Sequence, residues 1–231
     1  MVSFLSRLDN IAKRLAVWLD ERLGWRGVWE AIFLRKLPKV NWAYTLGSAT
    51  LFVALLQMVT GILLTIYYVP TPDYAYDTVQ FITHDVNAGW LIRGLHHYGA
   101  SALILLSVLH MARVVIYGSY KFPREVTWLS GVFLLLVTFG FGFTGYLLPW
   151  DQKAYWATTV GTSIVGIAPG IGDWLLRVLR GGQQLSEVSL ARFYGVHVWF
   201  LPASLLLLII IHMYLVIRNG ISEIPHKDDQ I

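Results

Sequence analysis

The chain has 231 residues, of which 56% are hydrophobic and only 14% are charged, and its formal net charge at pH 7 is +4. Soluble domains average about 25% charged residues, so the composition is that of a membrane protein. The sequence has no cysteine, which excludes disulfides, zinc–thiolate sites, thiolate-bound iron–sulfur clusters and thioether-linked cofactors within it. Its basic residues are not interleaved with aromatic ones in a groove-binding pattern, so no nucleic acid is expected as a partner.

The first 40 residues have the pattern of an amphipathic helix. No signal peptide is expected there, because charged residues interrupt every apolar run. Apolar residues recur at helical spacing with basic residues between them: Leu8, Ile11, Leu15, Trp18 and Leu19, with Arg7, Lys13, Arg14 and Arg22. The pattern predicts a helix that lies on a membrane surface, with packing against a partner protein as the alternative.

Four apolar stretches are long enough to cross the ~30 Å hydrocarbon core of a bilayer as helices. They cover about residues 44–69, 88–117, 128–148 and 193–218. The connection 70–90 is predicted to be a loop, and the connection 149–192 to contain short helical pieces such as 174–179. The expected fold class is an all-α membrane protein. It comprises an amphipathic surface segment (1–40), a four-transmembrane-helix bundle (41–220) and a polar tail (221–231).

The distribution of basic residues predicts the orientation of the bundle. Eight Lys and Arg residues precede the first span, whereas the connection 70–90 has none. The positive-inside rule therefore places both termini on the negative (cytoplasmic) side of a bacterial cytoplasmic membrane or an equivalent energy-transducing membrane. The second and fourth spans then both start at the positive side, so they run parallel to each other.

Each of these two parallel spans carries two histidines. His96 and His110 lie fourteen residues apart and His197 and His212 fifteen, so each pair shares one side of its helix at a separation of ~21–22 Å. A lone histidine in an apolar helix is more often a core residue, but four ionisable side chains at matched intervals inside membrane spans indicate function. We call His96 with His197, near the positive side, the outer pair, and His110 with His212 the inner pair. Two facing imidazoles suit the two axial positions of a haem iron, so two haem sites are predicted.

The other two spans carry glycines at the same interval of fourteen. Gly47 and Gly61 lie in the first span, and Gly131 and Gly145 lie in the third. Glycines are common in membrane helices because they allow close packing. They also let a bulky planar group approach the backbone, and their match to the histidine interval favours this second interpretation.

Two arginines lie three residues from histidines of the second span. Arg93 precedes His96 and Arg113 follows His110. A guanidinium binds carboxylates well, so both arginines are candidates for neutralising haem propionates. Anchoring of the helix ends at the membrane interface is the equally weighted alternative.

Together these residues resemble the cytochrome b family of quinol-oxidising respiratory and photosynthetic complexes. Besides the histidines and glycines, four segments carry the resemblance: residues 90–93 (WLIR), 123–128 (PREVTW), 145–152 (GYLLPWDQ) and 192–194 (RFY). The fifteen-residue histidine interval and the end shortly after the fourth span are similar to the short, split cytochrome b6 form.

The resemblance implies a cofactor set and a reaction. It implies two non-covalent b-type haems in a subunit of a quinol:cytochrome c (or plastocyanin-like acceptor) oxidoreductase. Quinol would be oxidised on the positive side, and electrons would cross the membrane to a quinone site on the negative side, coupled to proton translocation. The implied partners are a separate C-terminal cytochrome b half similar to subunit IV, a Rieske iron–sulfur protein, a c-type cytochrome, membrane lipid and a second copy of the complex.

The same resemblance implies further site residues. Ser119 and Trp128 would lie near the propionates of the inner haem. The wall of the quinol pocket would include aromatic and small residues at the end of the third span and in the following connection: Phe143, Tyr146, Trp156 and Ala157. Ordinary interface aromatics would give the same pattern.

Two departures from the family pattern limit these expectations. The split form usually has a cysteine near the start of the first span that attaches a further haem, but residues 42–47 read WAYTLG, so no covalent haem is expected. The proline–glutamate–tryptophan–tyrosine motif of the quinol pocket is absent, so the chain is not expected to turn over quinol alone. Two alternatives stay open: a dihaem membrane anchor of a hydrogenase or formate dehydrogenase, and a haem-free structural or transport bundle.

Overall fold

The computed structural model describes residues 2–23, 30 and 41–222. Within these residues the chain is helical, and four segments are long and apolar enough to cross a membrane: residues 42–65, 89–116, 125–147 and 187–219. The first three are α3 (Leu46–Thr65, after the short 3-10 helix η1, Trp42–Thr45), α5 (Gly89–Ile116) and α6 (Glu125–Leu147). The predicted all-α class with four spanning helices is confirmed.

The fourth span is one long helix with a widened turn. It consists of α9 (Glu187–Gly195), the π-helical turn η2 (Val196–Phe200) and α10 (Leu201–Asn219). Pro202 explains the widening, because it has no N–H to donate and its ring clashes with the carbonyl four residues earlier. The Leu201 N–H accordingly donates to the Val196 carbonyl, five residues back. His197 lies inside this turn.

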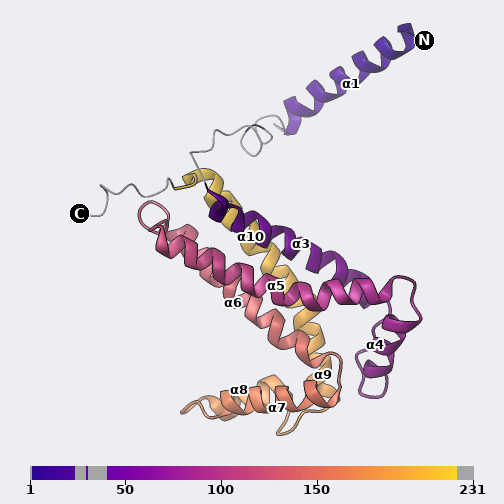
Figure 1. Ribbon diagram of the computed structural model, residues 1–231, viewed down its shortest axis with the longest axis vertical. Helices are drawn as coiled ribbons and strands as arrows, with labels where there is room; N and C mark the ends of the chain where they lie inside the picture. The colour runs from indigo at the N-terminus through magenta and orange to yellow at the C-terminus, as the bar shows by residue number, and fades with distance from the viewer. Residues whose placement is uncertain (1, 24–29, 31–40, 223–231) are drawn as a thin grey trace.

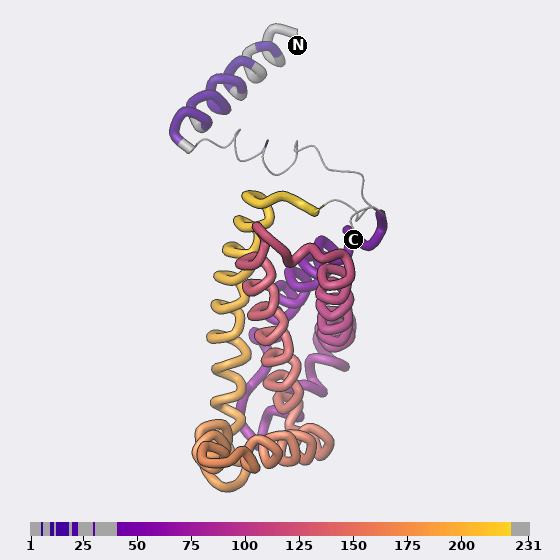
Figure 2. Tube along the Cα trace, turned by 90° about the vertical axis from the view of Figure 1, so that its left-hand side faces the viewer, coloured from indigo at the N-terminus to yellow at the C-terminus, as the bar shows by residue number. Residues whose placement is uncertain are grey.

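The four long helices lie side by side, and α5 and α10 run in the same direction (Figures 1 and 2). At one end, the Tyr44 hydroxyl at the start of the first span donates to the Ser222 carbonyl beyond α10, at 3.0 Å. At the other end, the Tyr68 hydroxyl beyond α3 donates to the Leu148 carbonyl beyond α6, at 2.6 Å. The first and third spans therefore run one way, and the two histidine-bearing helices run the other way, as the sequence predicts.

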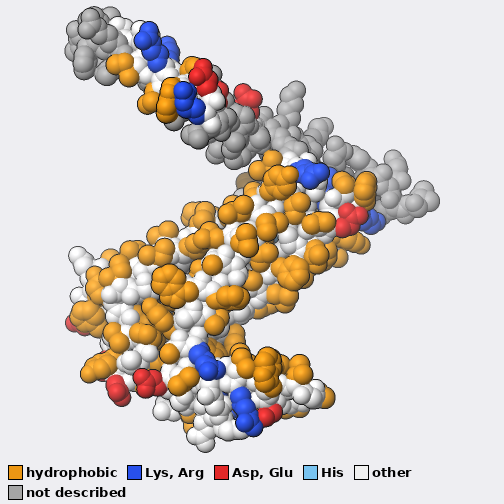
Figure 3. Space-filling model, turned by 180° about the vertical axis from the view of Figure 1, so that it is seen from behind, with side chains coloured by type: hydrophobic (Ala, Val, Ile, Leu, Met, Phe, Trp, Pro, Cys, Tyr) orange, Lys and Arg blue, Asp and Glu red, His pale blue; other side chains and the backbone are white. Residues whose placement is uncertain are grey.

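The outside of the bundle is strongly apolar. Large apolar side chains such as Phe52, Ile62 and Leu136 are exposed, whereas the polar side chains of Thr60, Ser130 and Thr138 are buried. Hydrophobic side chains cover most of the bundle face seen in Figure 3, and charged ones gather toward its ends. A lipid environment explains this distribution, since every polar group must then be satisfied inside the protein.

The connections between the spans contain more helix than predicted. The prediction that residues 70–90 form a loop is wrong, because α4 (Ala75–His84) occupies half of that connection. Ala75, Val79 and Ile82 form its buried face, and the helix packs against α5. Three aspartates in this segment obscured the short apolar repeat. The fourth span also begins at Glu187, six residues earlier than expected.

The connection 149–192 folds into a helical hairpin. Its arms, α7 (Gln152–Gly166) and α8 (Gly172–Arg180), pack against each other and lie across one end of the bundle (Figures 1 and 2). Asp151 caps α7, since its carboxylate accepts a hydrogen bond from the Ala154 N–H at 2.7 Å. The capping position follows directly from the Pro-Trp-Asp sequence, because aspartate is a favoured N-cap residue.

A buried arginine holds the hairpin together. The Arg180 side chain, whose residue is 6% exposed, donates to the Thr162 hydroxyl at 2.7 Å, the Ser163 hydroxyl at 2.8 Å and the Thr159 carbonyl at 2.6 Å. It also donates to the Gln183 carbonyl at 2.8 Å. All these partners are neutral, so the guanidinium is satisfied by hydrogen bonds alone.

Replacing Arg180 by methionine should loosen the hairpin. The loss should be at least about 2 kcal/mol, the contribution of one hydrogen bond to a charged group. Hydrogen exchange and limited proteolysis over residues 152–190 of the assembled protein would measure it. Arg177→Met is the matched control, because Arg177 forms only an exposed 2.9 Å ion pair with Asp173, and such pairs contribute little. Equal protection in the two variants would contradict the assigned role of Arg180.

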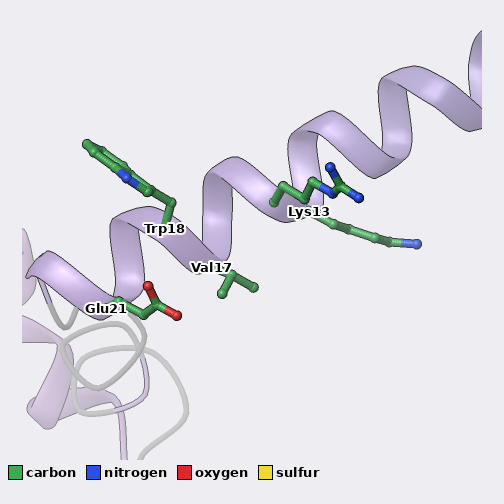
Figure 4. A pocket seen from close by; sticks show the side chains of 5 residues that line it. Lys13, Val17, Trp18 and Glu21 are labelled. Carbon is green, nitrogen blue, oxygen red and sulfur yellow. The ribbon is translucent and has the colours of Figure 1, made fainter.

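The predicted N-terminal helix is present as α1 (Val2–Leu23). Ile11, Leu15 and Trp18 are exposed on it, and a shallow pocket along the helix is lined by Lys13, Val17, Trp18 and Glu21 among others (Figure 4). The side chains of Leu8, Leu19 and Arg7 lie outside the described set. The membrane-surface role of the segment 1–40, like the boundary of the polar tail, stays a prediction.

Candidate functional site

The outer pair of histidines meets in the interior of the bundle. The ring centroids of His96 on α5 and His197 in η2 are 6.3 Å apart, and the ring planes are inclined by 76°. Two metal–nitrogen bonds of about 2 Å each, together with the radii of two imidazoles, account for a separation of this size. At the other level of the bundle, His110 of α5 lies against Gly47 of α3, and His212 of α10 lies against Gly131 of α6. The structure thus brings the outer pair together and places each inner histidine against its predicted glycine, and iron ligation by either pair stays a prediction.

Each predicted glycine lies against one of the four histidines. A Cβ atom added at Gly47 would lie 3.1 Å from Cε1 of His110, and one at Gly61 would lie 3.2 Å from Cε1 of His96. On the other side of the bundle, a Cβ at Gly131 would lie 3.4 Å from Cε1 of His212 and one at Gly145 only 2.7 Å from Cε1 of His197. The sequence analysis expected room for a planar cofactor. The contacts show that these glycines also make room for the imidazoles themselves.

Three hydroxyl groups that the sequence analysis missed contact the histidines. Thr60 Oγ1 lies 3.0 Å from Nδ1 of His96, Thr144 Oγ1 3.0 Å from Nδ1 of His197, and Ser130 Oγ 2.8 Å from Nδ1 of His212. Each of the three directly precedes one of the predicted glycines. That adjacency was the available signal, but threonine and serine are too common in membrane helices to be selected by it alone.

Arg113 has the environment of an anion-binding residue. Its guanidinium lies 3.6 Å from the Tyr44 ring centroid and 5.0 Å from that of Tyr117. Its Nε and Nη2 atoms are buried without a hydrogen-bond partner among the described residues. A buried, unpaired guanidinium is costly unless an anion neutralises it, so a carboxylate such as a haem propionate fits here. Arg93 is half-buried and forms no hydrogen bond or ion pair with a described residue.

The two other residues assigned to the inner propionates lie at the same end of the bundle. Ser119 is buried, and its hydroxyl is hydrogen-bonded to that of Ser222 at 2.5 Å. Trp128 contacts Tyr120, with ring centroids 5.8 Å apart. A serine hydroxyl can donate and accept at once, so its bond to Ser222 leaves capacity for a further partner. Propionate binding by either residue stays a prediction.

The four residues assigned to the quinol pocket form an open surface. Phe143 packs on Phe193, with ring centroids 5.6 Å apart, and the Trp156 indole N–H donates to the Gln152 side-chain oxygen at 2.9 Å. Tyr146, Trp156 and Ala157 are exposed. A shallow depression of about 470 Å³ lies beside them, lined by Tyr76, Trp150, Asp151, Gln152 and Lys153. Quinol binding there stays a prediction, and the exposed wall would need another polypeptide to close it.

The neighbouring 145–152 motif is tied firmly to the rest of the bundle. Leu147 is buried in a cluster with Leu185 and Phe193, and Trp150 adopts a left-handed conformation with φ of 52°. Burial raises the pKa of the Tyr68 phenol, and electrostatic repulsion from the Tyr194 phenol raises it further by a smaller amount. The Tyr68 phenol therefore stays protonated at physiological pH and continues to donate to the Leu148 carbonyl.

Comparison with known proteins agrees with this geometry. A family model described as cytochrome b/b6/petB matches residues 33–220. Cytochrome b6 of Synechococcus elongatus is 41% identical over 206 residues, covering 89% of this chain and 96% of the relative. Cytochrome b6 of Prochlorococcus marinus (strain AS9601) is 40% identical over 206 residues, covering 89% of this chain and 94% of the relative.

A solved structure gives the same fold. A chain from a structure titled "Hyperthermophilic respiratory Complex III" matches with a TM-score of 0.82 and 32% sequence identity, over 93% of this chain and 58% of that chain. Four spanning helices with facing histidine pairs define a class of haem-binding electron-transport proteins of the membrane. The chain belongs to the cytochrome b/b6 family. The resemblance seen in the motifs and the similarity to the short b6 form are both confirmed.

Proposed function

We propose that this chain is the dihaem cytochrome b subunit of a quinol:cytochrome c oxidoreductase, or of one that uses a plastocyanin-like acceptor. Its function would be to carry electrons from quinol oxidised on the positive side to a quinone site on the negative side, coupled to proton translocation. The observation that carries the proposal is the 6.3 Å separation of the His96 and His197 rings, from two different helices. His110 lies about 21 Å further along α5, where it lies against Gly47 as His96 lies against Gly61.

The residues of the chain fit a b-type haem in three respects. Each pair offers two imidazole nitrogen ligands, and the glycines leave space where a Cβ atom would crowd the imidazole. Arg113 has buried N–H groups with no hydrogen-bond partner in the described part of the chain, and these suit a carboxylate. A bound haem supplies one-electron oxidation and reduction at its iron. His96 and His197 would hold the iron of the outer haem, and His110 and His212 that of the inner haem.

The proposed partners follow from what this chain does not itself supply. The cytochrome b6 relatives are matched over 94% and 96% of their length, whereas the complex III chain extends well beyond the match. A separate C-terminal half would close the exposed quinol wall at Phe143, Tyr146 and Trp156. A Rieske protein and a c-type cytochrome would accept electrons on the positive side, where α7 and α8 would lie in the predicted orientation, and the complex would be a homodimer.

Haem content and redox titration of the purified complex test this proposal. We expect two non-covalent haems for each copy of the chain and two separate midpoint potentials. Copurification with a Rieske protein would support the assignment, whereas a molybdenum or nickel subunit in its place would favour a membrane anchor of a formate dehydrogenase or hydrogenase. A complex without iron would indicate a structural or transport bundle and would overturn the proposal.

Replacing Arg113 by glutamine should weaken haem binding at the inner site only. Loss of a charged hydrogen bond to a propionate costs about 1.5–3 kcal/mol, which corresponds to about tenfold or more in affinity. The inner midpoint potential should also fall, because a positive charge near a redox centre favours its reduced state. Arg113→Lys keeps the charge and should retain most of both properties. A Gln variant with unchanged haem retention and midpoint would contradict propionate binding by Arg113.

A further inference from the structure

We propose that Thr60, Ser130 and Thr144 are positioning residues that set the electronic properties of the two sites unequally. The outer site has two histidines supported by hydroxyl groups, and the inner site has one. This inference rests on the proposed function, since it concerns histidines that ligate haem. Part of the difference in midpoint potential between the two sites would then come from these three hydroxyl groups and from the lack of a fourth hydroxyl beside the remaining histidine.

The hydrogen bonds define which nitrogen of each ring carries the proton. Each hydroxyl donates its one hydrogen to a carbonyl of its own helix: Thr60 to Leu56, Ser130 to Thr127 and Thr144 to Gly140, each at 2.7 Å. With its hydrogen committed, the hydroxyl oxygen can only accept from the Nδ1–H of the facing histidine. A neutral imidazole has a single N–H, so its Nε2 is left unprotonated and available to a metal.

No hydroxyl group among the described residues is hydrogen-bonded to the ring of the fourth histidine, His110. Leu46 occupies the position before Gly47, where the other three helical segments have a hydroxyl residue. Within the described residues, His110 therefore faces a glycine but has no hydrogen bond from its ring to a neighbouring side chain. The inner site consists of one supported ligand, His212, and one unsupported ligand, His110.

This asymmetry has a defined electronic consequence. Donation of the Nδ1–H to an acceptor raises the basicity of a ligating imidazole. A more basic ligand stabilises the oxidised metal and lowers the midpoint potential. The outer site, with two such ligands, should therefore have the lower midpoint, and the inner site the higher one. Electron transfer from the positive side to the negative side is then energetically downhill, which is the direction that the proposed function requires.

Redox titration of the purified complex, followed in the visible bands of the two haems with haem content measured in parallel, tests the inference. Thr60→Val and Thr144→Val should each shift the outer midpoint upward and leave the inner one in place. Ser130→Ala should shift only the inner midpoint upward. Leu46→Thr, which installs the missing hydroxyl opposite His110, should shift the inner midpoint downward. Thr144→Ser keeps the hydroxyl and should behave as the native protein.

Thr138→Val is the matched control. Thr138 is buried in α6 like Ser130, and its hydroxyl donates to the Leu134 carbonyl at 2.9 Å and forms no hydrogen bond with a histidine of the described residues, so both midpoints should stay unchanged. Fully haem-loaded Thr60→Val and Leu46→Thr complexes with native midpoints would overturn the inference. If a valine variant loses its haem, Leu46→Thr still decides between the outcomes. A native complex that contains no haem would instead refute the proposed function.

Discussion

The His110→Ala variant should lose the inner haem and keep the outer one. In the proposed function His110 would be one of the two iron ligands of the inner site, and no other histidine of α5 lies at that level of the bundle, because the next one, His97, lies about 20 Å away along the helix. Haem content should fall by about half, and one of the two midpoints should disappear. Pyridine haemochrome analysis with a redox titration of the purified complex measures both quantities.

His97→Ala is the control for this experiment. His97 adjoins a proposed ligand in the sequence, but it is exposed and packs edge-on against Tyr98 with ring centroids 5.1 Å apart. Its replacement should leave both haems bound. Retention of both haems in His110→Ala would contradict the inner ligand assignment, and loss of both would contradict two independent sites.

The Gly145→Ala variant should lose affinity at the outer site. A Cβ atom at this position would lie 2.7 Å from Cε1 of His197, closer than real side-chain carbons approach one another, so the ring or the helix must move. Overpacking of this kind costs about 1–3 kcal/mol, equivalent to about fivefold to a hundredfold weaker haem retention. Dissociation of haem to an excess of apomyoglobin would give the relative affinities.

Gly131→Ala separates two roles of these glycines. Its Cβ atom would lie 3.4 Å from Cε1 of His212, an ordinary contact distance, so crowding of the imidazole predicts a mild effect at the inner site. A loss as large as that of Gly145→Ala would instead show that the glycine makes room for the macrocycle itself. We expect Gly145→Ala to be the more damaging of the two.

The pairing of the histidines could be predicted from the sequence because it depends on regular geometry. Membrane spans are recognised by length and composition, their alternation makes α5 and α10 parallel, and the helical repeat places His96 and His110 on one face. The same reasoning located Gly47, Gly61, Gly131 and Gly145. These features needed no knowledge of individual side-chain contacts.

The features that the sequence did not reveal depend on local departures from that geometry. In a uniform α-helix, His197 and His212 would point in directions ~60° apart around the helix axis. The π-helical turn before Pro202 contains one extra residue, which reduces this angle. Helix α4 was hidden because its apolar repeat spans only ten residues. The hydroxyls of Thr60, Ser130 and Thr144 become recognisable only when the facing histidine is known.

The unpaired guanidinium of Arg113 also bears on biogenesis. If a haem carboxylate binds there as proposed, the newly inserted polypeptide first holds a cation within the bilayer whose buried N–H groups have no partner among the described residues. Such an intermediate is less stable than the haem-loaded subunit and unfolds locally more often. Its unfolded segments are then accessible to membrane-bound quality-control proteases. Cells starved of iron-porphyrin should therefore degrade this polypeptide rapidly instead of accumulating an empty form.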